Sequence, residues 1–203
     1  MKKEELLNKL RQNTHVQYEM PTIDIEGIRY EDTLEQFVKM TETVGGHVVK
    51  LDSSASLAQL IHAAYPQARV FASNLEEVDA AALQEAAGCD IELRNPDTVS
   101  EANNLNGVDV GIVRGEVGVA ENGCIWIPQS MKEKALLFIS EYLVIVLSHQ
   151  QVVDNMHDAY ARIKMDSAYN FGTFISGPSK TADIEQALVM GAQAARGVTV
   201  VLI

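Results

Sequence analysis

Apolar residues in the first hundred positions alternate between helical and strand-like spacing. Segment 31–46 places four residues on one helical face and ends at Gly45-Gly46, which favours a helix C-terminus. The four residues on that face are Leu34, Phe37, Val38 and Thr41. Strands are predicted at 47–51, 68–73 and 90–93, with helices at 57–65 and 76–88 between them. This alternation is typical of right-handed crossovers in a parallel sheet.

The second half of the chain predicts several short strands. Asn122-Gly123 lies between two apolar runs and is a strong hairpin signal, because both residues tolerate a positive φ. Apolar runs at 108–113, 117–120, 124–127, 135–139, 142–147, 172–176 and 198–203 predict strands, and helices are predicted at 150–165 and 181–195. We expect a three-layer α/β fold with a mostly parallel or mixed sheet. A single domain would span 1–203, with an N-terminal helix and tail at 1–20.

The charge balance argues against polyanionic partners. The chain has 16 Lys and Arg residues against 28 Asp and Glu residues, a net charge of -12. Binding to phosphate backbones or to an anionic membrane surface requires clustered cations. We therefore expect no nucleic-acid partner and no membrane partner.

The cysteines and the apolar runs predict the compartment. Cys89 and Cys124 form no CxxC pair, which predicts neither a disulfide framework nor iron–sulfur ligands. The first residues lack the continuous apolar core of a signal peptide. The longest apolar run, 135–147, is broken by polar residues and is too short to span a bilayer. We expect a cytoplasmic protein.

A turn that leads into the predicted C-terminal helix is a candidate anion site. The chain turns through Gly177 and reaches Ser179, Lys180 and Thr181 where that helix would begin. Unpaired N–H groups at a helix N-terminus attract anions, and the helix dipole adds to this attraction. The hydroxyls would donate hydrogen bonds, and the lysine would supply a positive charge.

The same residues also fit a purely structural role. Ser179 or Thr181 would cap the helix, and Pro178 would stiffen the turn. Asp183 and Glu185 would satisfy the positive end of the helix themselves and repel a nearby phosphate. The pattern leaves ligand binding and capping open.

The predicted hairpin turn carries a second candidate. Glu121 stands at a strand end beside Asn122 and Gly123, where a carboxylate is well placed as a nucleophile. Glu-Asn-Gly also resembles a short motif of coenzyme A transferases, in which the glutamate forms a thioester. The alternatives are a residue that contacts ligand without reacting, or an exposed turn carboxylate.

Other polar residues give weaker signals. Arg114 follows an apolar run and would reach a carboxylate or phosphate, or pair with Glu116. Cys124 has no histidine tied to it by a motif, which favours a small buried residue. His149 and His157 show no acidic ligand pattern, so we expect no metal site. No dinucleotide or P-loop fingerprint occurs, and the sequence leaves the cofactor unknown.

The final third of the chain resembles the LUD domain, the family of the C-type lactate utilization proteins. Residues 176–185, SGPSKTADIE, match the family's most recognisable motif throughout. Residues 117–127 resemble its Ile-Ala-Asp/Glu-Thr-Gly-Thr segment. The resemblance implies a fold like that of the sugar-phosphate isomerase and coenzyme A transferase group, an analogy that does not by itself give an activity.

The chain departs from the family pattern at three places. Residues 122–124 are Asn-Gly-Cys where the family has Thr-Gly-Thr. Gln193 stands where many members have a histidine, and the proline that follows it there is lost. A histidine and a proline are also absent near 140–143. These departures imply a divergent member with a different ligand or none.

The resemblance implies a role in lactate or organic-acid utilization, beside iron–sulfur partner subunits that carry the electrons. The first alternative is a stand-alone enzyme that binds an acyl thioester or sugar phosphate at Glu121, Asn122 and the 177–181 turn. The second is a structural or regulatory subunit whose site has decayed. Edge strands and Trp126, which would pack in the core or an interface, favour a homodimer. Whether the chain is an enzyme stays open.

Overall fold

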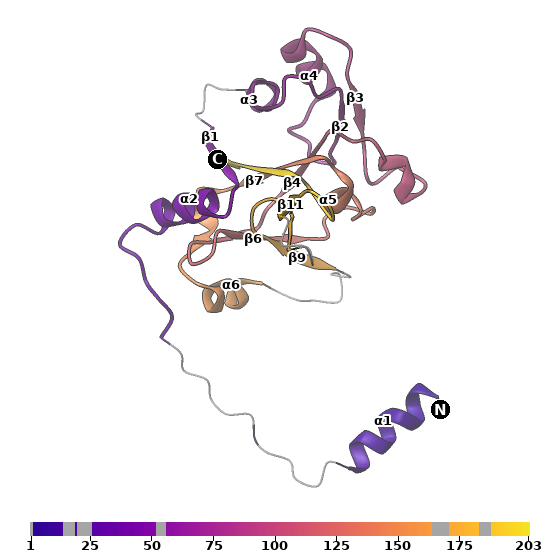
Figure 1. Cartoon of the computed structure of the whole chain (residues 1–203), viewed down its shortest axis with the longest axis vertical. Coiled ribbons are helices and arrows are strands. Elements are labelled where there is room, and N and C mark those ends of the chain that lie inside the picture. Colours follow the sequence, from indigo (N-terminus) through magenta and orange to yellow (C-terminus); the bar gives the residue numbers. More distant parts are fainter. Residues whose placement is uncertain (1, 14–18, 20–25, 52–55, 164–170, 183–187) are drawn as a thin grey trace.

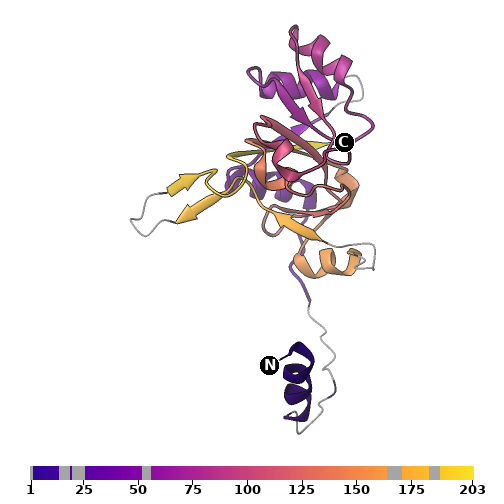
Figure 2. The ribbon, with the colours of Figure 1, turned by 90° about the vertical axis from the view of Figure 1, so that its right-hand side faces the viewer.

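The computed structural model describes residues 2–13, 19, 26–51, 56–163, 171–182 and 188–203 of the chain (Figure 1). The described residues form one α/β body, with a short helix at one end and a projecting strand pair (Figures 1 and 2).

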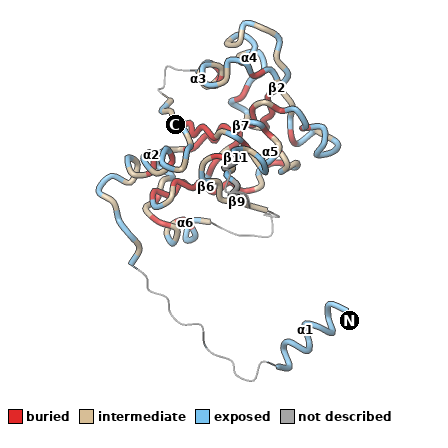
Figure 3. Tube along the Cα trace, in the orientation of Figure 1, coloured by how far each residue is buried: buried red, intermediate tan, exposed pale blue. Residues whose placement is uncertain are grey.

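A six-stranded parallel sheet forms the centre of the body. Its strand order is β1-β12-β7-β4-β2-β3, and each neighbouring pair is parallel. The strands are β1 (His47–Lys50), β12 (Gly197–Leu202), β7 (Tyr142–Leu147), β4 (Val110–Arg114), β2 (Val70–Ala72) and β3 (Glu92–Arg94). The central strands β12, β7 and β4 are runs of Val, Ile and Leu, as expected for strands that are buried on both faces. Figure 3 shows this buried centre in red.

Two helices cover one face of the parallel sheet. These are α3 (Leu57–Ala64) and α4 (Ala80–Ala87). Ile61 and Leu83 pack there against Phe71 of β2. Asp79 caps α4 by accepting a hydrogen bond of 2.9 Å from the N–H of Ala82, which is the capping that its side chain favours.

A second sheet covers the opposite face, with α2 (Thr33–Thr43) and α5 (Leu136–Ile139) beside it. Its order is β8-β5-β6-β9, in which only the β5–β8 pair is parallel. The strands are β8 (Val152–Val153), β5 (Val117–Val119), β6 (Cys124–Pro128) and β9 (Gly172–Ile175). Phe37, Ile125 and Leu136 pack between the two sheets. The mostly parallel central sheet flanked by helices confirms the predicted α/β, three-layer class.

The remaining elements lie at the edges. Helix α6 (Met156–Arg162) packs on the outer face of the second sheet, against Val119 and Trp126. Two 3-10 turns are η1 (Ala102–Leu105) and η2 (His149–Gln151). Helix α1 (Lys3–Gln12) contributes no buried residue and lies apart from the body in Figure 1. No helix in the described ranges is both long and apolar enough to cross a membrane.

One predicted strand in the second half is wrong, and one predicted helix begins later than expected. The apolar run 135–139 forms the helix α5 instead of a strand, because Leu136 and Leu137 are both buried by a single helical turn. Ser140 stabilises that turn by donating its hydroxyl to the carbonyl oxygen of Leu136 at 2.8 Å. The predicted helix 150–165 is shorter than expected, because β8 pairs with β5 and the helix begins only after Asn155, its N-cap.

The predicted helix at 181–195 is also wrong. Its first residues belong to the strand β10 (Lys180–Ala182) and its middle forms the strand β11 (Leu188–Met190). The two strands pair antiparallel, with Lys180 opposite Met190. Gly191 has a left-handed φ of +78°, which interrupts any helix through this stretch. The N–H of Gly191 instead donates to the carbonyl oxygen of Ser179 at 2.9 Å. Residues 183–187 of this prediction lie outside the described residues.

Candidate functional site

The 121–123 turn closes the β5–β6 hairpin, as the Asn-Gly pair predicted. Gly123 adopts a φ of +66°, and its N–H donates to the carbonyl oxygen of Val119 at 2.9 Å. A Cβ atom at Gly123 would lie 2.7 Å from the backbone nitrogen of Thr41. The turn therefore packs directly on α2, at a distance that only glycine allows. Asn122 faces its own backbone, because its Oδ1 accepts from the N–H of Cys124 at 3.1 Å.

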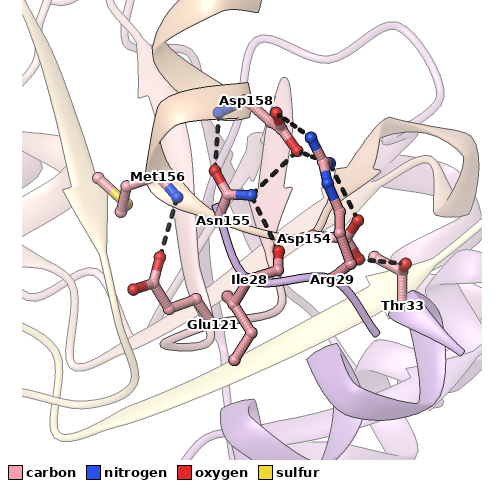
Figure 4. Close-up of polar contacts among 8 residues, drawn as sticks. All are labelled: Ile28, Arg29, Thr33, Glu121, Asp154, Asn155, Met156 and Asp158. Carbon is pink, nitrogen blue, oxygen red and sulfur yellow. Dashed lines mark hydrogen bonds and ion pairs between the residues drawn. The ribbon is translucent and has the colours of Figure 1, made fainter. Parts of the chain in front are cut away.

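Glu121 is engaged with the start of α6 (Figure 4). Its Oε2 accepts a hydrogen bond of 3.0 Å from the N–H of Met156, the first residue of the helix. Its own N–H donates to the carbonyl oxygen of Asp154 at 2.9 Å. The carboxylate thus satisfies a free N–H of the first helical turn, which is a structural contact.

An N-terminal strap, residues 26–33, holds the same segment from the other side (Figure 4). Arg29 forms ion pairs with Asp154, at 3.2 Å, and with Asp158. Asn155 donates its side-chain N–H to the carbonyl oxygen of Ile28 at 3.1 Å, and Thr33 donates its hydroxyl to Asp154 at 2.5 Å. The strap and Glu121 together fix the residues that start α6.

The charges in this network shift two pKa values. Hydrogen bonds to Asp158 and Asp154 raise the pKa of Arg29 above its usual value. Burial pushes the pKa of Asp154 upward, but hydrogen bonds from Thr33, Arg29 and the backbone of Tyr30 outweigh it, so the pKa is lower than usual. Both shifts favour the charged forms that make the ion pair.

The 176–180 loop contacts the C-terminal end of α2, a few residues beyond the contact that the 121–123 turn makes with this helix. Gly177 has a φ of +65°, and a Cβ atom there would lie 2.5 Å from the carbonyl oxygen of Val44. The ammonium of Lys180 donates to that same carbonyl oxygen. Ser176 donates its hydroxyl to the carbonyl oxygen of Asn122 at 2.9 Å, which joins the loop to the hairpin turn. Two segments far apart in sequence thus converge on the C-terminal end of α2.

The loop also forms one wall of a cleft of about 360 Å³. Five residues with polar side chains line it: Thr173, Ser176, Ser179, Lys180 and Gln193. Its apolar lining comes from Leu137, Phe138, Leu143, Phe174 and Val198. An apolar pocket with a few convergent polar groups is the usual form of a small-molecule site. The polar set holds one cation and no carboxylate, which suits an anionic ligand.

The predicted helix-based anion site is corrected by these contacts. Lys180 and Thr181 begin the strand β10, so no helix N-terminus points its N–H groups at a ligand there. The N–H of Ser179 is occupied as well, because it donates to the carbonyl oxygen of Ala195 at 2.9 Å. Any anion would therefore be held by side chains on the rim of the cleft.

The structure brings together most of the predicted site residues but separates one. Asn122 and Gly123 lie beside the loop that carries Gly177, Ser179 and Lys180. The backbone of Thr181 continues this loop into β10.

Arg114 lies elsewhere, at the end of β4, and pairs with Glu77 and not with the expected Glu116. It does not line the cleft. Burial raises the pKa of the Cys124 thiol to about 12, so this side chain is a protonated core residue at neutral pH, as its sequence context favoured.

Sequence reasoning missed the apolar half of the cleft. Phe138 and Leu137 lie on α5, which was predicted to be a strand, and Phe174 lies on β9. Gln193 was noticed only as a departure from the family pattern, and that departure was the available signal. Within the described ranges, no three His, Cys, Asp or Glu side chains gather as a metal site would require.

The parallel sheet, its helical layers and the cleft define a three-layer α/β protein. The chain belongs to the LUD domain family, which it matches over residues 34–203. That family is associated with lactate utilization. A search of proteins with curated functions found no match.

A solved structure shares the fold. It is the crystal structure of a DUF162 family protein from Deinococcus radiodurans, with a TM-score of 0.59 and 18% sequence identity. The similarity covers 84% of this chain and 95% of that chain. At this identity the likeness shows the fold alone.

Proposed function

We propose that this protein serves in lactate or organic-acid utilization by binding a small organic anion in the cleft beside the 176–180 loop. The observation that carries the proposal is the lining of that cleft. Lys180, Ser179 and Gln193 line this cleft together with Phe138 and Phe174. A short carboxylate would place its charge near the ammonium and its carbon chain on the aromatic rings.

The electrons of any oxidation would leave through partner subunits. Conversion of a 2-hydroxy acid to a 2-oxo acid releases a pair of electrons and two protons, so an acceptor is required. Iron–sulfur clusters are held by sets of cysteine thiolates, and this chain has only Cys89 and Cys124. Cys124 is buried inside the second sheet. We therefore propose iron–sulfur subunits as the acceptors, with this chain supplying the anion site.

Ligand-induced stabilisation tests the proposal. We would measure the melting temperature of the purified protein with lactate, other 2-hydroxy acids, coenzyme A, short acyl thioesters and sugar phosphates. A ligand at about a hundred times its Kd adds roughly 2.7 kcal/mol. For a domain of this size, that is a rise of roughly 5–10 °C.

Matched variants locate the site. Lys180→Ala and Gln193→Ala should abolish the rise produced by a 2-hydroxy acid, whereas Lys9→Ala on the exposed helix α1 should leave it unchanged. A rise that survives both cleft variants would place the ligand elsewhere and contradict the proposal.

A second candidate function is favoured by the hydrogen bond between Ser176 and Asn122. That bond brings the Glu-Asn-Gly turn beside the loop, as a stand-alone enzyme for acyl thioesters or sugar phosphates would need. In such an enzyme, Glu121 would leave the N–H of Met156 and attack the carbonyl carbon of an acyl thioester. The C–S bond would break, the thiolate would leave, and an acyl–glutamyl anhydride would form. A thioester or phosphate response that disappears in Glu121→Gln would favour this candidate over the carboxylate site.

A further inference from the structure

A second hollow of about 270 Å³, called here the side pocket, adjoins the cleft. Its polar lining consists of Ser140, Glu141, Gln193 and Arg196. Phe138, Gln193 and Ala194 line both spaces, so the two lie side by side. Small-molecule sites usually occupy roughly 300–1,000 Å³. The cleft lies near the lower end of that range, and the side pocket gives room for a longer ligand.

The chain between Gly191 and Arg196 contributes to both spaces and is fixed at its two ends. The N–H of Gly191 donates to the carbonyl oxygen of Ser179, and the N–H of Ser179 donates to that of Ala195, each at 2.9 Å. The N–H of Arg196 donates to the carbonyl oxygen of Glu141, also at 2.9 Å. These bonds hold the polar groups of the two spaces in a fixed relation, which lowers the cost of ordering them around a ligand.

Arg196 is the cation of the side pocket. Its Nη1 forms an ion pair with Oε1 of Glu141 at 2.8 Å, and its guanidinium lies 5.3 Å from the centre of the Tyr142 ring. These contacts orient the guanidinium, yet the side chain is still 58% exposed. A guanidinium has several N–H donors in a planar fork that suits a carboxylate, and the ion pair engages only Nη1. Arg196 can therefore bind an anion while it stays beside Glu141.

The charges of the two spaces favour a ligand with two negative groups. The cleft is lined by Lys180 and no carboxylate, and the side pocket by Arg196 and Glu141. The ion pair between Arg196 and Glu141 is exposed to solvent and is therefore weak. The described lining thus carries an excess of positive charge in a chain whose net charge is -12.

We propose that the ligand of this site is a 2-hydroxy dicarboxylate, with one carboxylate at Lys180 in the cleft and the other at Arg196 in the side pocket. Gln193 lines both spaces and would contact the part of the ligand between its two carboxylates. The amide of this residue can both donate and accept a hydrogen bond, which suits a hydroxyl group. The inference rests on the proposed function and deepens it, because Arg196 would select dicarboxylates over monocarboxylates such as lactate.

Calorimetric titration with pairs of ligands of equal chain length tests this selection. Malate is compared with 2-hydroxybutyrate, and 2-hydroxyglutarate with 2-hydroxyvalerate, so that only the second carboxylate differs within a pair. A hydrogen bond between charged groups is worth roughly a factor of ten or more in affinity. At least one dicarboxylate should therefore bind about tenfold more tightly than its matched monocarboxylate.

Variants of the two cations locate the carboxylates. Arg196→Ala should remove the advantage of the dicarboxylate and leave the Kd of the monocarboxylate unchanged, which also shows that the variant is folded. Lys180→Ala should weaken both members of a pair. Arg162→Ala is the matched control, because it removes an exposed guanidinium from α6 that lines neither space, and it should change neither Kd.

The outcomes distinguish this inference from the proposed function. Monocarboxylate binding that requires Lys180, without a preference for the dicarboxylate in either pair, would overturn the inference and leave the proposed function standing. A preference that persists in Arg196→Ala would overturn the inference as well, because the second carboxylate would then bind elsewhere. If neither class of ligand binds, both the inference and the proposed function are wrong.

Discussion

Two turns lie against the same helix, α2, yet they differ in what their polar groups contact. In the 121–123 turn, Glu121 caps α6 and Asn122 bonds to the backbone, so the side chains serve the fold. In the 176–180 loop, the side chains of Ser179 and Lys180 line a cleft. The first turn matches a catalytic motif more suggestively, but the second has the surroundings of a binding site. The contacts of these side chains, and not their likeness to a motif, distinguish the structural turn from the candidate binding loop.

The largest expected effects come from the glycines at which both turns contact α2. Gly123→Ala and Gly177→Ala would each place a Cβ atom against the backbone of α2 at a positive φ. We expect each to lower the free energy of unfolding by about 2–4 kcal/mol, measured by urea denaturation. Gly88→Ala is the control, because it has the same φ region with no atom within 4 Å of the added Cβ. It should cost only about 1 kcal/mol.

The next effect concerns Glu121. Glu121→Ala removes the acceptor for the N–H of Met156 and should cost about 1 kcal/mol, as the loss of a helix cap does. Glu121→Gln keeps an acceptor oxygen and should cost less. If the cleft is the site, both variants keep the response to 2-hydroxy acids. Loss of that response in Glu121→Gln, with the melting temperature unchanged, would instead give the first turn a direct role.

The strap gives a smaller effect that depends on pH. The pKa of Asp154 is lower in the folded protein than in the unfolded chain. Its contribution to stability is therefore complete above the usual carboxyl pKa of about 4 and is lost as the pH falls through the folded value. Melting temperatures between pH 7 and 3 should fall less steeply in Asp154→Asn than in the wild-type protein. If the curves of melting temperature against pH were parallel for the two proteins, the strap would not contribute to the loss of stability in acid.

The smallest stability effect is expected for Lys180→Ala. The residue is exposed, and its ammonium donates a hydrogen bond to the carbonyl oxygen of Val44. Its removal should change the melting temperature by no more than about 2 °C, in line with surface substitutions in general. A much larger fall would show that the lysine mainly holds the loop to α2. That result would weaken its assignment to the cleft.

The parallel sheet could be predicted well because its signals are local. Strands such as β7 are continuous apolar runs, and α2 and α4 end at glycines that stop a helix. The hairpin turn was equally readable, because Asn122-Gly123 determines its own geometry. In these elements, short-range sequence preferences agree with the final packing.

The errors fall where long-range contacts decide the structure. The run 135–139 is apolar in every position. In the structure it forms one short helical turn, which buries Leu136 and Leu137. The periodicity of so short an apolar run cannot distinguish a strand from a helical turn. Residues 181–195 are rich in alanine, which favours a helix. The N–H of Gly191 nevertheless donates to the carbonyl oxygen of Ser179, and the residues between them include the paired strands β10 and β11. Both errors affect the prediction of the cleft, because Phe138 lies on α5 and Gln193 follows β11. Its members could therefore be named only in part.

The position of β12 has a consequence for biosynthesis. Among the described strands, β1 pairs only with β12, and β12 also pairs with β7, although residues 47–50 and 197–202 lie far apart in the sequence. During synthesis a domain folds as a unit, once its residues are available. Here the sheet cannot close until residues 197–202 have left the ribosome, so β1 lacks its partner strand while the residues between β1 and β12 are translated. Chaperones that shield exposed strand edges should therefore matter more for this chain during synthesis than after it.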